Sequence, residues 1–546
     1  ASRMADPGRG LRNKFAGEET ITPIISETVR LTGDFFNYGT SAYNEIHLHN
    51  GEFLHNIGLR GQGMQLAMLD NGYSNYTALK AFDSVNANGQ VLGTWDFVGR
   101  EANVSNDGSH GMNCWSTIAA NIPGSFVGKA PKASFWLFRT EDDASEYPVE
   151  EHNWVCAAER ADSAGVDVIS SSLGYFDFDN SSLNYTYANM NGNTTISSRG
   201  ADMAAKKGLM VFVSAGNEGN GPWHYLTTPS DGDSVVCVGA VTSTGVVGGF
   251  SSYGPSADGQ VKPDMASVGV SAVVQTVFNT IGTANGTSFA CPNMAGMGTC
   301  LWQGFPEFAN MKIVRALQQA GSIAGTPNDR IGYGIPNLKS AFKTLLVDYS
   351  TATAAIANCV VTVTWNTKDV SAMKYEIERK APGESSFTKV GELPAQSGTT
   401  VLANKTYTFT NSLVGNSNTG TYAFRIRQVI DTATASFTDA YIDTVSVAMS
   451  ASCLPQVTAV KVKMAPNPPQ GSMAHLLVET PDAVANLEIA IYDAKGARMY
   501  ARQTSKTAGT AIFDIPVYGF AVGKYIVNVS RGGKLLATTD LFIPRH

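Results

Sequence analysis

The feature that most constrains this chain is a repeated alternation of short apolar runs and helical stretches between about residues 50 and 345. Apolar runs at 64–69 and 209–213 predict buried strands, whereas the stretches at 110–121 and 149–164 predict helices. Strands that are apolar throughout and alternate with helices are typical of a parallel sheet covered on both faces. The predicted fold class of this region is therefore α/β.

Beyond about residue 350 the pattern changes to apolar–polar alternation interrupted by turns, as in 362–365 and 422–427. A Pro-rich break at 464–469 opens another region of the same kind. Such alternation predicts two small all-β sandwich domains. The predicted organisation is an N-terminal extension at 1–45, a mainly parallel α/β domain at 46–346, a β-sandwich at 350–455 and a C-terminal β-sandwich at 456–546.

Bulk composition excludes some functions. The 546 residues carry a net charge of −7 and a pI near 5.7, which gives no electrostatic basis for binding nucleic acid. No apolar run reaches the roughly 18 residues of a membrane span. Only 16% of the residues are charged, and with abundant small polar residues this favours an extracellular protein.

The seven cysteines are an odd number, so they cannot all pair within one chain. Cys359 and Cys453 bracket the first β region, where they either form a bond or remain two free thiols. The other cysteines show no metal-ligand spacing, and for each of them a buried free thiol or an occasional bridge is expected.

Polar residues stand where predicted parallel strands end, as Asp70, Ser172 and Asn217 do. In α/β sheets functional groups gather at the carboxyl ends of the strands. We therefore expect these three side chains to lie near one another.

Three fragments carry complementary chemistry: Asp70 after a strand, His110 at a helix start, and Ser288 after Gly286 at another helix start. A serine nucleophile needs a base, which histidine supplies near neutral pH, and the imidazole needs a carboxylate to orient it. Asn217 is placed to donate, with the Ser288 N–H, to a developing oxyanion. Each fragment alone has an ordinary reading as a turn or a helix cap, but their joint occurrence favours catalysis.

These residues, in the order Asp, His, Ser, resemble the subtilisin-like serine proteases over roughly residues 55–345. The resemblance implies that Asp70, His110 and Ser288 form the catalytic triad and that Asn217 is the oxyanion donor. It also implies that Ser172, Leu173 and Gly174 form the backbone edge that binds an extended substrate. This sequence departs from the usual pattern of the family at Asn71, at 112–116 and at Cys291. We expect these departures to affect substrate preference and thiol sensitivity.

The two β regions resemble known accessory modules. The first is similar to a fibronectin type III domain, on Trp365, Tyr375 and Tyr422. The second resembles the C-terminal sorting domain of the type IX secretion system, on 465–468 and 523–525 together with 491–493, with a plain β-sandwich as the alternative. The latter resemblance implies export through outer-membrane secretion machinery and a secreted or bacterial cell-surface location.

The predicted function is a secreted serine endopeptidase that hydrolyses protein or peptide substrates through an acyl-enzyme. The alternative is a catalytically silent adhesin or binding protein on the same fold. No cofactor is required and no metal ligands are assigned; structural Ca²⁺ is common in the family, but no ligand loop stands out here. The acidic loop at 141–143 is interpreted as solvated surface or substrate-facing charge, and a monomer is expected.

Overall fold

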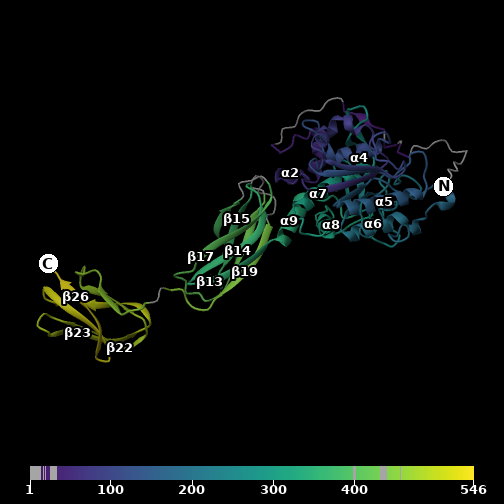
Figure 1. Cartoon of the computed structure of the whole chain (residues 1–546). Coiled ribbons are helices and arrows are strands. Elements are labelled where there is room, and N and C mark those ends of the chain that lie inside the picture. Colours follow the sequence, from purple (N-terminus) through teal and green to yellow (C-terminus); the bar gives the residue numbers. More distant parts are fainter. Residues whose placement is uncertain are drawn as a thin grey trace.

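A computed structural model describes residues 14–15, 17–18, 20–24, 33–396, 401–430, 440–454 and 457–545. Figure 1 shows the chain as three successive bodies: an α/β body in purple to teal, a green body of strands, and a yellow body of strands at the C-terminal end.

The first body is organised around a seven-stranded sheet in the order β10-β9-β8-β7-β2-β6-β3. Every neighbouring pair in it is parallel. Its strands are β2 (Gln65–Asp70), β3 (Val91–Asp96), β6 (Ser134–Arg139), β7 (Val168–Ser171), β8 (Met210–Ser214), β9 (Val236–Val241) and β10 (Met265–Val268). The predicted parallel α/β fold is confirmed.

Both faces of this sheet are buried, because successive side chains of a strand point to opposite faces. Leu66 and Met68 of β2 belong to one hydrophobic core, whereas Ala67 and Leu69 belong to another. Residues of α4 and α7 line the first core, and residues of α5 and α6 line the second. These helices are α4 (His110–Ala119), α7 (Thr287–Gln303), α5 (Val149–Ala164) and α6 (Ile196–Lys207).

Smaller elements complete the body. The helices are α1 (Thr40–Leu48), α2 (Glu52–Asn56), α3 (Asp83–Ala87), α8 (Asn310–Gln319) and α9 (Leu338–Tyr349), and the short strands are β4 (Asn121–Ile122) and β5 (Phe126–Val127). Helix α1 begins before the predicted domain start at residue 46, because Ala42, Tyr43 and Ile46 are buried in the first core. The packed body therefore includes the end of the predicted N-terminal extension.

The N-terminal segment contributes a strand that its sequence does not suggest. Strand β1 (Thr22–Pro23) pairs antiparallel with β12 (Ile281–Ala284), which pairs with β11 (Ala272–Gln275). Because β12 ends shortly before Ser288, this pairing brings the N-terminal segment to the start of α7.

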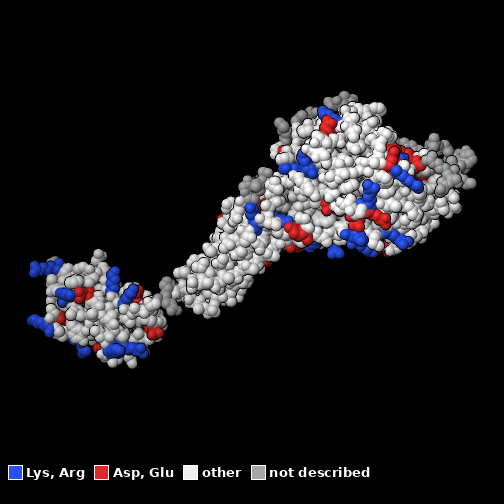
Figure 2. Space-filling model, viewed as in Figure 1, with Lys and Arg blue, Asp and Glu red and all other residues white. Residues whose placement is uncertain are grey.

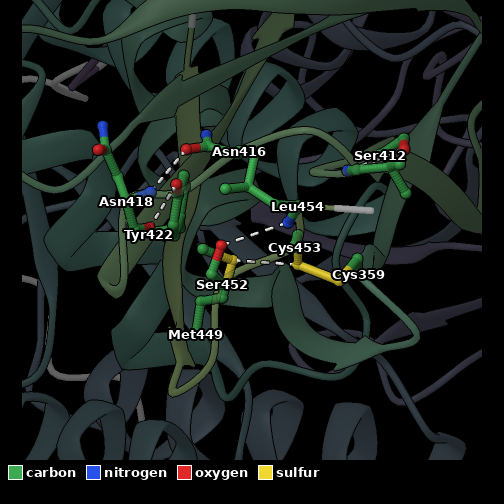
Figure 3. The surroundings of a disulfide bond; sticks show 10 residues. Cys359, Ser412, Asn416, Asn418, Tyr422, Met449, Ser452, Cys453 and Leu454 are labelled. Atoms are coloured by element: carbon green, nitrogen blue, oxygen red, sulfur yellow. Dashed lines mark hydrogen bonds between the residues drawn. A yellow bond between two sulfur atoms is a disulfide. The ribbon is translucent and has the colours of Figure 1, made fainter. Parts of the chain in front are cut away.

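The middle body consists of two antiparallel sheets, β13-β14-β17 and β16-β15-β18-β19, which share a core around Trp365, Tyr375 and Tyr407. Their strands are β13 (Thr351–Ala357), β14 (Val360–Asp369), β15 (Lys374–Lys380), β16 (Thr388–Pro394), β17 (Ala403–Ser412), β18 (Gly420–Val429) and β19 (Ala440–Met449). Cys359 and Cys453 form a disulfide with Cα atoms 5.6 Å apart, which decides the alternative that the sequence left open (Figure 3). It ties the residue before β14 to the segment after β19.

The middle body packs on the first. Strands β14 and β19 contact α9. The Lys368 ammonium donates to the Gly304 carbonyl at 2.8 Å and pairs with Glu307.

The last body has its own core, built from the sheets β20-β21-β24 and β23-β22-β25-β26. Its strands are β20 (Lys461–Met464), β21 (Met473–Thr480), β22 (Val484–Tyr492), β23 (Arg498–Lys506), β24 (Gly509–Pro516), β25 (Gly523–Arg531) and β26 (Lys534–Ile543). The predicted hairpin turn at 493–496 joins β22 to β23.

On the face of the whole molecule shown in Figure 2, basic and acidic side chains are interspersed rather than gathered into one basic surface.

Candidate active site

Asp70 and His110 meet at the carboxyl edge of the sheet. Asp70 is the last residue of β2 and His110 is the first residue of α4. Their side chains are buried, and His110 Nδ1 lies 2.7 Å from Asp70 Oδ1. Gly111 permits this approach, because a Cβ there would lie 2.7 Å from the Asp70 Cβ. The structure thus brings together two residues that are far apart in the sequence, with an orientation suited to holding the imidazole.

Charge at this pair favours a protonated imidazole. Burial by itself lowers the pKa of His110, but the carboxylate of Asp70, the sulfur of Cys114 and the carboxylate of Glu18 hold that pKa well above its ordinary value. Burial raises the pKa of Asp70, against the opposing effect of His110. These charges therefore stabilise the protonated imidazole relative to the neutral form that would accept a proton.

Ser288 is the second residue of α7, where backbone N–H groups have no acceptor within the helix. Its Oγ donates to the Ser172 carbonyl over 3.4 Å, and the Ser172 hydroxyl donates to the Ser288 carbonyl at 2.7 Å. Within the described residues, no hydrogen bond joins the Ser288 hydroxyl to His110. The expected serine–histidine bond is therefore not made in this conformation, and the long bond to Ser172 is weak enough to exchange.

Thr287 fixes the orientation of the Asn217 amide. Asn217 Oδ1 accepts from the Thr287 N–H at 2.8 Å and from its hydroxyl at 3.0 Å. With its oxygen so engaged, the amide presents Nδ2 to a carboxylate oxygen of Glu18 at 2.8 Å. The role of Thr287 was not foreseen from the sequence, although its place beside Ser288 was the available signal.

Glu18 and Phe15 of the N-terminal segment occupy the site. The second carboxylate oxygen of Glu18 lies 3.4 Å from His110 Nε2. A Cβ on Gly286, two residues before Ser288, would lie 2.1 Å from the same oxygen. The Phe15 ring stacks on the His110 ring with centroids 4.3 Å apart. An anion thus rests between the Asn217 amide, the imidazole and the start of α7.

Comparison with known proteins agrees with this geometry. Residues 61–334 match the model of the subtilase family, peptidase S8. This chain belongs to the subtilase family. It is 30% identical over 292 residues to subtilisin NAT of Bacillus subtilis subsp. natto and to subtilisin E of Bacillus subtilis, covering 53% of this chain and 68% of each of those proteins. It is 29% identical to a subtilisin of Bacillus pumilus, of which the match covers 94%.

The predicted substrate edge of this subtilase lies directly after β7. Leu173 is buried in the same core as Phe15. Gly174 sits so close to Thr227 that a Cβ would lie 2.0 Å from the Thr227 hydroxyl. Phe15 of the N-terminal segment and the predicted substrate edge therefore share one hydrophobic core.

Two clusters in the subtilase domain have metal-binding residue types. Asp70, His110 and Cys114 form one, and Glu141, Glu146 and Glu150 form the other. In the first, Asp70 and His110 bond to each other, and burial raises the pKa of the Cys114 thiol to about 12. In the second, the Lys14 ammonium lies among the carboxylates.

The acidic loop at 141–143 is only partly what the sequence suggested. The Glu141 side chain is 1% exposed, so its interpretation as solvated surface was wrong. Cys114, Cys237, Cys291 and Cys300 are buried free thiols, as expected, whereas Cys156 is a free thiol that is exposed. Among the described residues, no helix combines the length and apolarity needed to cross a membrane.

Proposed function

We propose that this subtilase is a secreted serine endopeptidase that cleaves proteins or peptides through an acyl-enzyme. Ser288 attacks the peptide carbonyl, His110 takes the Ser288 proton and later gives it to the leaving amine, and Asp70 holds the imidazole. The strongest support is the Glu18 carboxylate, which is held at 2.8 Å by Asn217 Nδ2 and lies 3.4 Å from His110 Nε2. An anion bound there marks a place where negative charge is stabilised.

Two local changes start the reaction. Glu18 leaves, which removes a negative charge beside His110 and lowers the pKa of the imidazole toward the neutral form that serves as base. The Ser288 hydroxyl turns from the Ser172 carbonyl toward His110 Nε2. Catalytic hydrogen bonds are often absent or long before substrate binds, so a side-chain rotation of this kind is an ordinary requirement.

The oxyanion of the tetrahedral intermediate then takes the place that the Glu18 carboxylate vacates. Asn217 Nδ2 and the Ser288 N–H donate to it. The two hydrogen bonds from Thr287 to Asn217 Oδ1 keep the amide in the orientation in which Nδ2 donates. All groups used in these steps belong to the chain, so the chemistry calls for no cofactor, and structural Ca²⁺ stays unassigned.

The two strand bodies have accessory roles in this proposal. The middle body acts as a fibronectin type III-like spacer, supported by its own disulfide and by its packing on α9. The last body acts as a type IX sorting domain that engages outer-membrane secretion machinery, so that the monomeric enzyme is released or held at a bacterial surface.

A serine-directed fluorophosphonate probe tests the catalytic proposal on the full chain. We expect covalent labelling and cleavage of a casein substrate by the native protein, and neither by the Ser288→Ala variant. Ser182→Ala, an exposed serine in a short turn distant from the triad in sequence, is the matched control and retains both. Equal absence of labelling in native protein and Ser288→Ala would favour the silent adhesin instead.

A further inference from the structure

The second acidic cluster holds a lysine of the chain itself. Lys14 Nζ lies 2.8 Å from Glu141, 3.0 Å from Glu146 and 2.8 Å from Glu150. The side chains of Glu141 and Glu150 are each 1% exposed, and Glu146 is the most accessible of the three at 21%. The cluster is therefore a pocket lined by three carboxylates and filled by one ammonium group.

This pocket is electrostatically unfavourable without a cation. Its carboxylate oxygens lie within 4.8 Å of one another. Burial raises the pKa of Glu146 to about 7, and burial together with the charge of Glu141 raises the pKa of Glu150 well above its ordinary value. Buried like charges disfavour ionisation unless an opposite charge is present. The pocket therefore favours a positively charged group.

The carboxylates are held by groups other than Lys14. The Tyr175 hydroxyl donates to Glu141 at 2.6 Å. Glu150 accepts from the backbone N–H groups of Asp142 at 2.8 Å and of Tyr147 at 3.2 Å. Glu141 and Glu150 thus have partners of their own that do not depend on Lys14.

The pocket also lies near His110. Phe15, the residue next to Lys14, stacks on the His110 ring. Tyr175, which holds Glu141, directly follows the predicted substrate edge at Ser172–Gly174 and shares a core with Phe15. A polypeptide lying in the cleft in place of the N-terminal segment would bring one of its side chains to the same carboxylates.

We propose that Glu141, Glu146 and Glu150 form a specificity pocket for a lysine or arginine side chain of the substrate, close to the cleaved bond. This inference rests on the proposed peptidase function and names its substrate class: polypeptides with a basic residue at one fixed position. Lys14 is the internal occupant that a substrate displaces.

Cleavage profiling tests the pocket on the full chain with a peptide library. We expect Lys and Arg to be enriched at one position relative to the cleaved bond, by about 30-fold in kcat/KM over Gln there. Glu146→Gln removes this preference by lowering kcat/KM for the Lys and Arg peptides. Glu159→Gln, an exposed glutamate on the same α5 helix as Glu150, is the control and keeps the preference. Lys14→Gln raises kcat/KM for basic peptides more than for the Gln peptide.

A binding measurement separates failure of the pocket from failure of the peptidase. In the Ser288→Ala variant, fluorescence anisotropy compares a Lys peptide with its Gln counterpart, with and without Glu146→Gln. Tighter binding of the Lys peptide that depends on Glu146 supports the pocket even if no cleavage occurs. Cleavage without a basic preference, or a preference that survives Glu146→Gln, overturns it. Stabilisation by Ca²⁺ that depends on Glu146, with no preference for basic peptides, identifies a metal site and also overturns it.

Discussion

The α/β body and the C-terminal strand body differ in what they bury. Asp70, His110, Glu141 and Glu150 are all at most 1% exposed in the first body. In the described part of the last body, the buried polar side chains are Thr480 and Lys506. Burying charge costs free energy unless partners compensate, whereas apolar strands gain from burial. At the carboxyl edge of the sheet the buried Asp70 and His110 compensate each other at 2.7 Å, whereas the mainly apolar core of the last body suits a structural role.

The largest effect that tests this contrast is expected from Asp70→Asn. The amide leaves the fold intact but cannot stabilise the imidazolium or hold the correct tautomer, so we expect kcat to fall by about 10⁴-fold. Steady-state kinetics on a peptide substrate measure the loss. Asp83→Asn, an exposed aspartate at the start of α3, is the matched control and keeps full activity. A loss below tenfold would mean that the buried charge at this edge is structural.

The next effect is expected at Asn217. Asn217→Ala removes the amide that now holds Glu18, and we expect kcat to fall by about 10²–10³-fold with little change in KM, a magnitude whose source is subtilisin itself. Asn180→Ala, an exposed asparagine that caps a short 3-10 turn, serves as the control. A change confined to KM would contradict the assignment, because ground-state binding and not the oxyanion would then be affected.

A smaller effect in the opposite direction is expected at Glu18. Glu18→Gln keeps the side-chain size but removes the negative charge beside His110, so the segment is held less tightly and kcat/KM should rise by about tenfold. Because Glu18 raises the pKa of His110, its removal lowers that pKa and shifts the acidic limb of the kcat/KM profile to lower pH. Gln62→Ala, outside the contacts of this segment, should leave the pH profile unchanged. An unshifted pH profile would show that the charge of Glu18 does not affect the pKa of His110.

The smallest effect on catalysis is expected from the middle body. Replacing both Cys359 and Cys453 by serine opens a crosslink between residues 94 positions apart and should lower the stability of this body by about 2–5 kcal/mol. Differential scanning calorimetry detects the loss, while kcat stays at the native value. Cys156→Ser, at an exposed free thiol, is the matched control. A fall in kcat would show that the middle body supports the active site directly.

Local patterns carried most of the fold prediction. The run that became β2 was predicted within one residue, and α5 was predicted at its observed bounds, because burial on both faces and helical periodicity are written into neighbouring residues. Asp70, Ser172 and Asn217 could be placed together because parallel strands end at one edge. Their roles, like those of His110 and Ser288, remain predictions until the variants are measured.

The N-terminal segment was beyond such patterns. Lys14 and Glu18 lie in a stretch without periodicity, and their partners Glu141 and His110 are 127 and 92 positions away. No pattern among neighbouring residues predicts a contact between segments so far apart in the sequence. The direction of the Ser288 hydroxyl depends on competition between two acceptors, the Ser172 carbonyl and the imidazole. Only the folded protein brings both of these acceptors near Ser288.

The sequence by itself determined the parallel α/β framework, the strand bodies and the residue types that gather at the sheet edge, because periodicity and strand direction act locally. The tertiary structure decided which groups face one another: the Glu18 carboxylate beside the Asn217 amide, a lysine among three glutamates, and the Ser288 hydroxyl directed at the Ser172 carbonyl. These depend on distances between remote segments, and electrostatic energies change steeply with such distances.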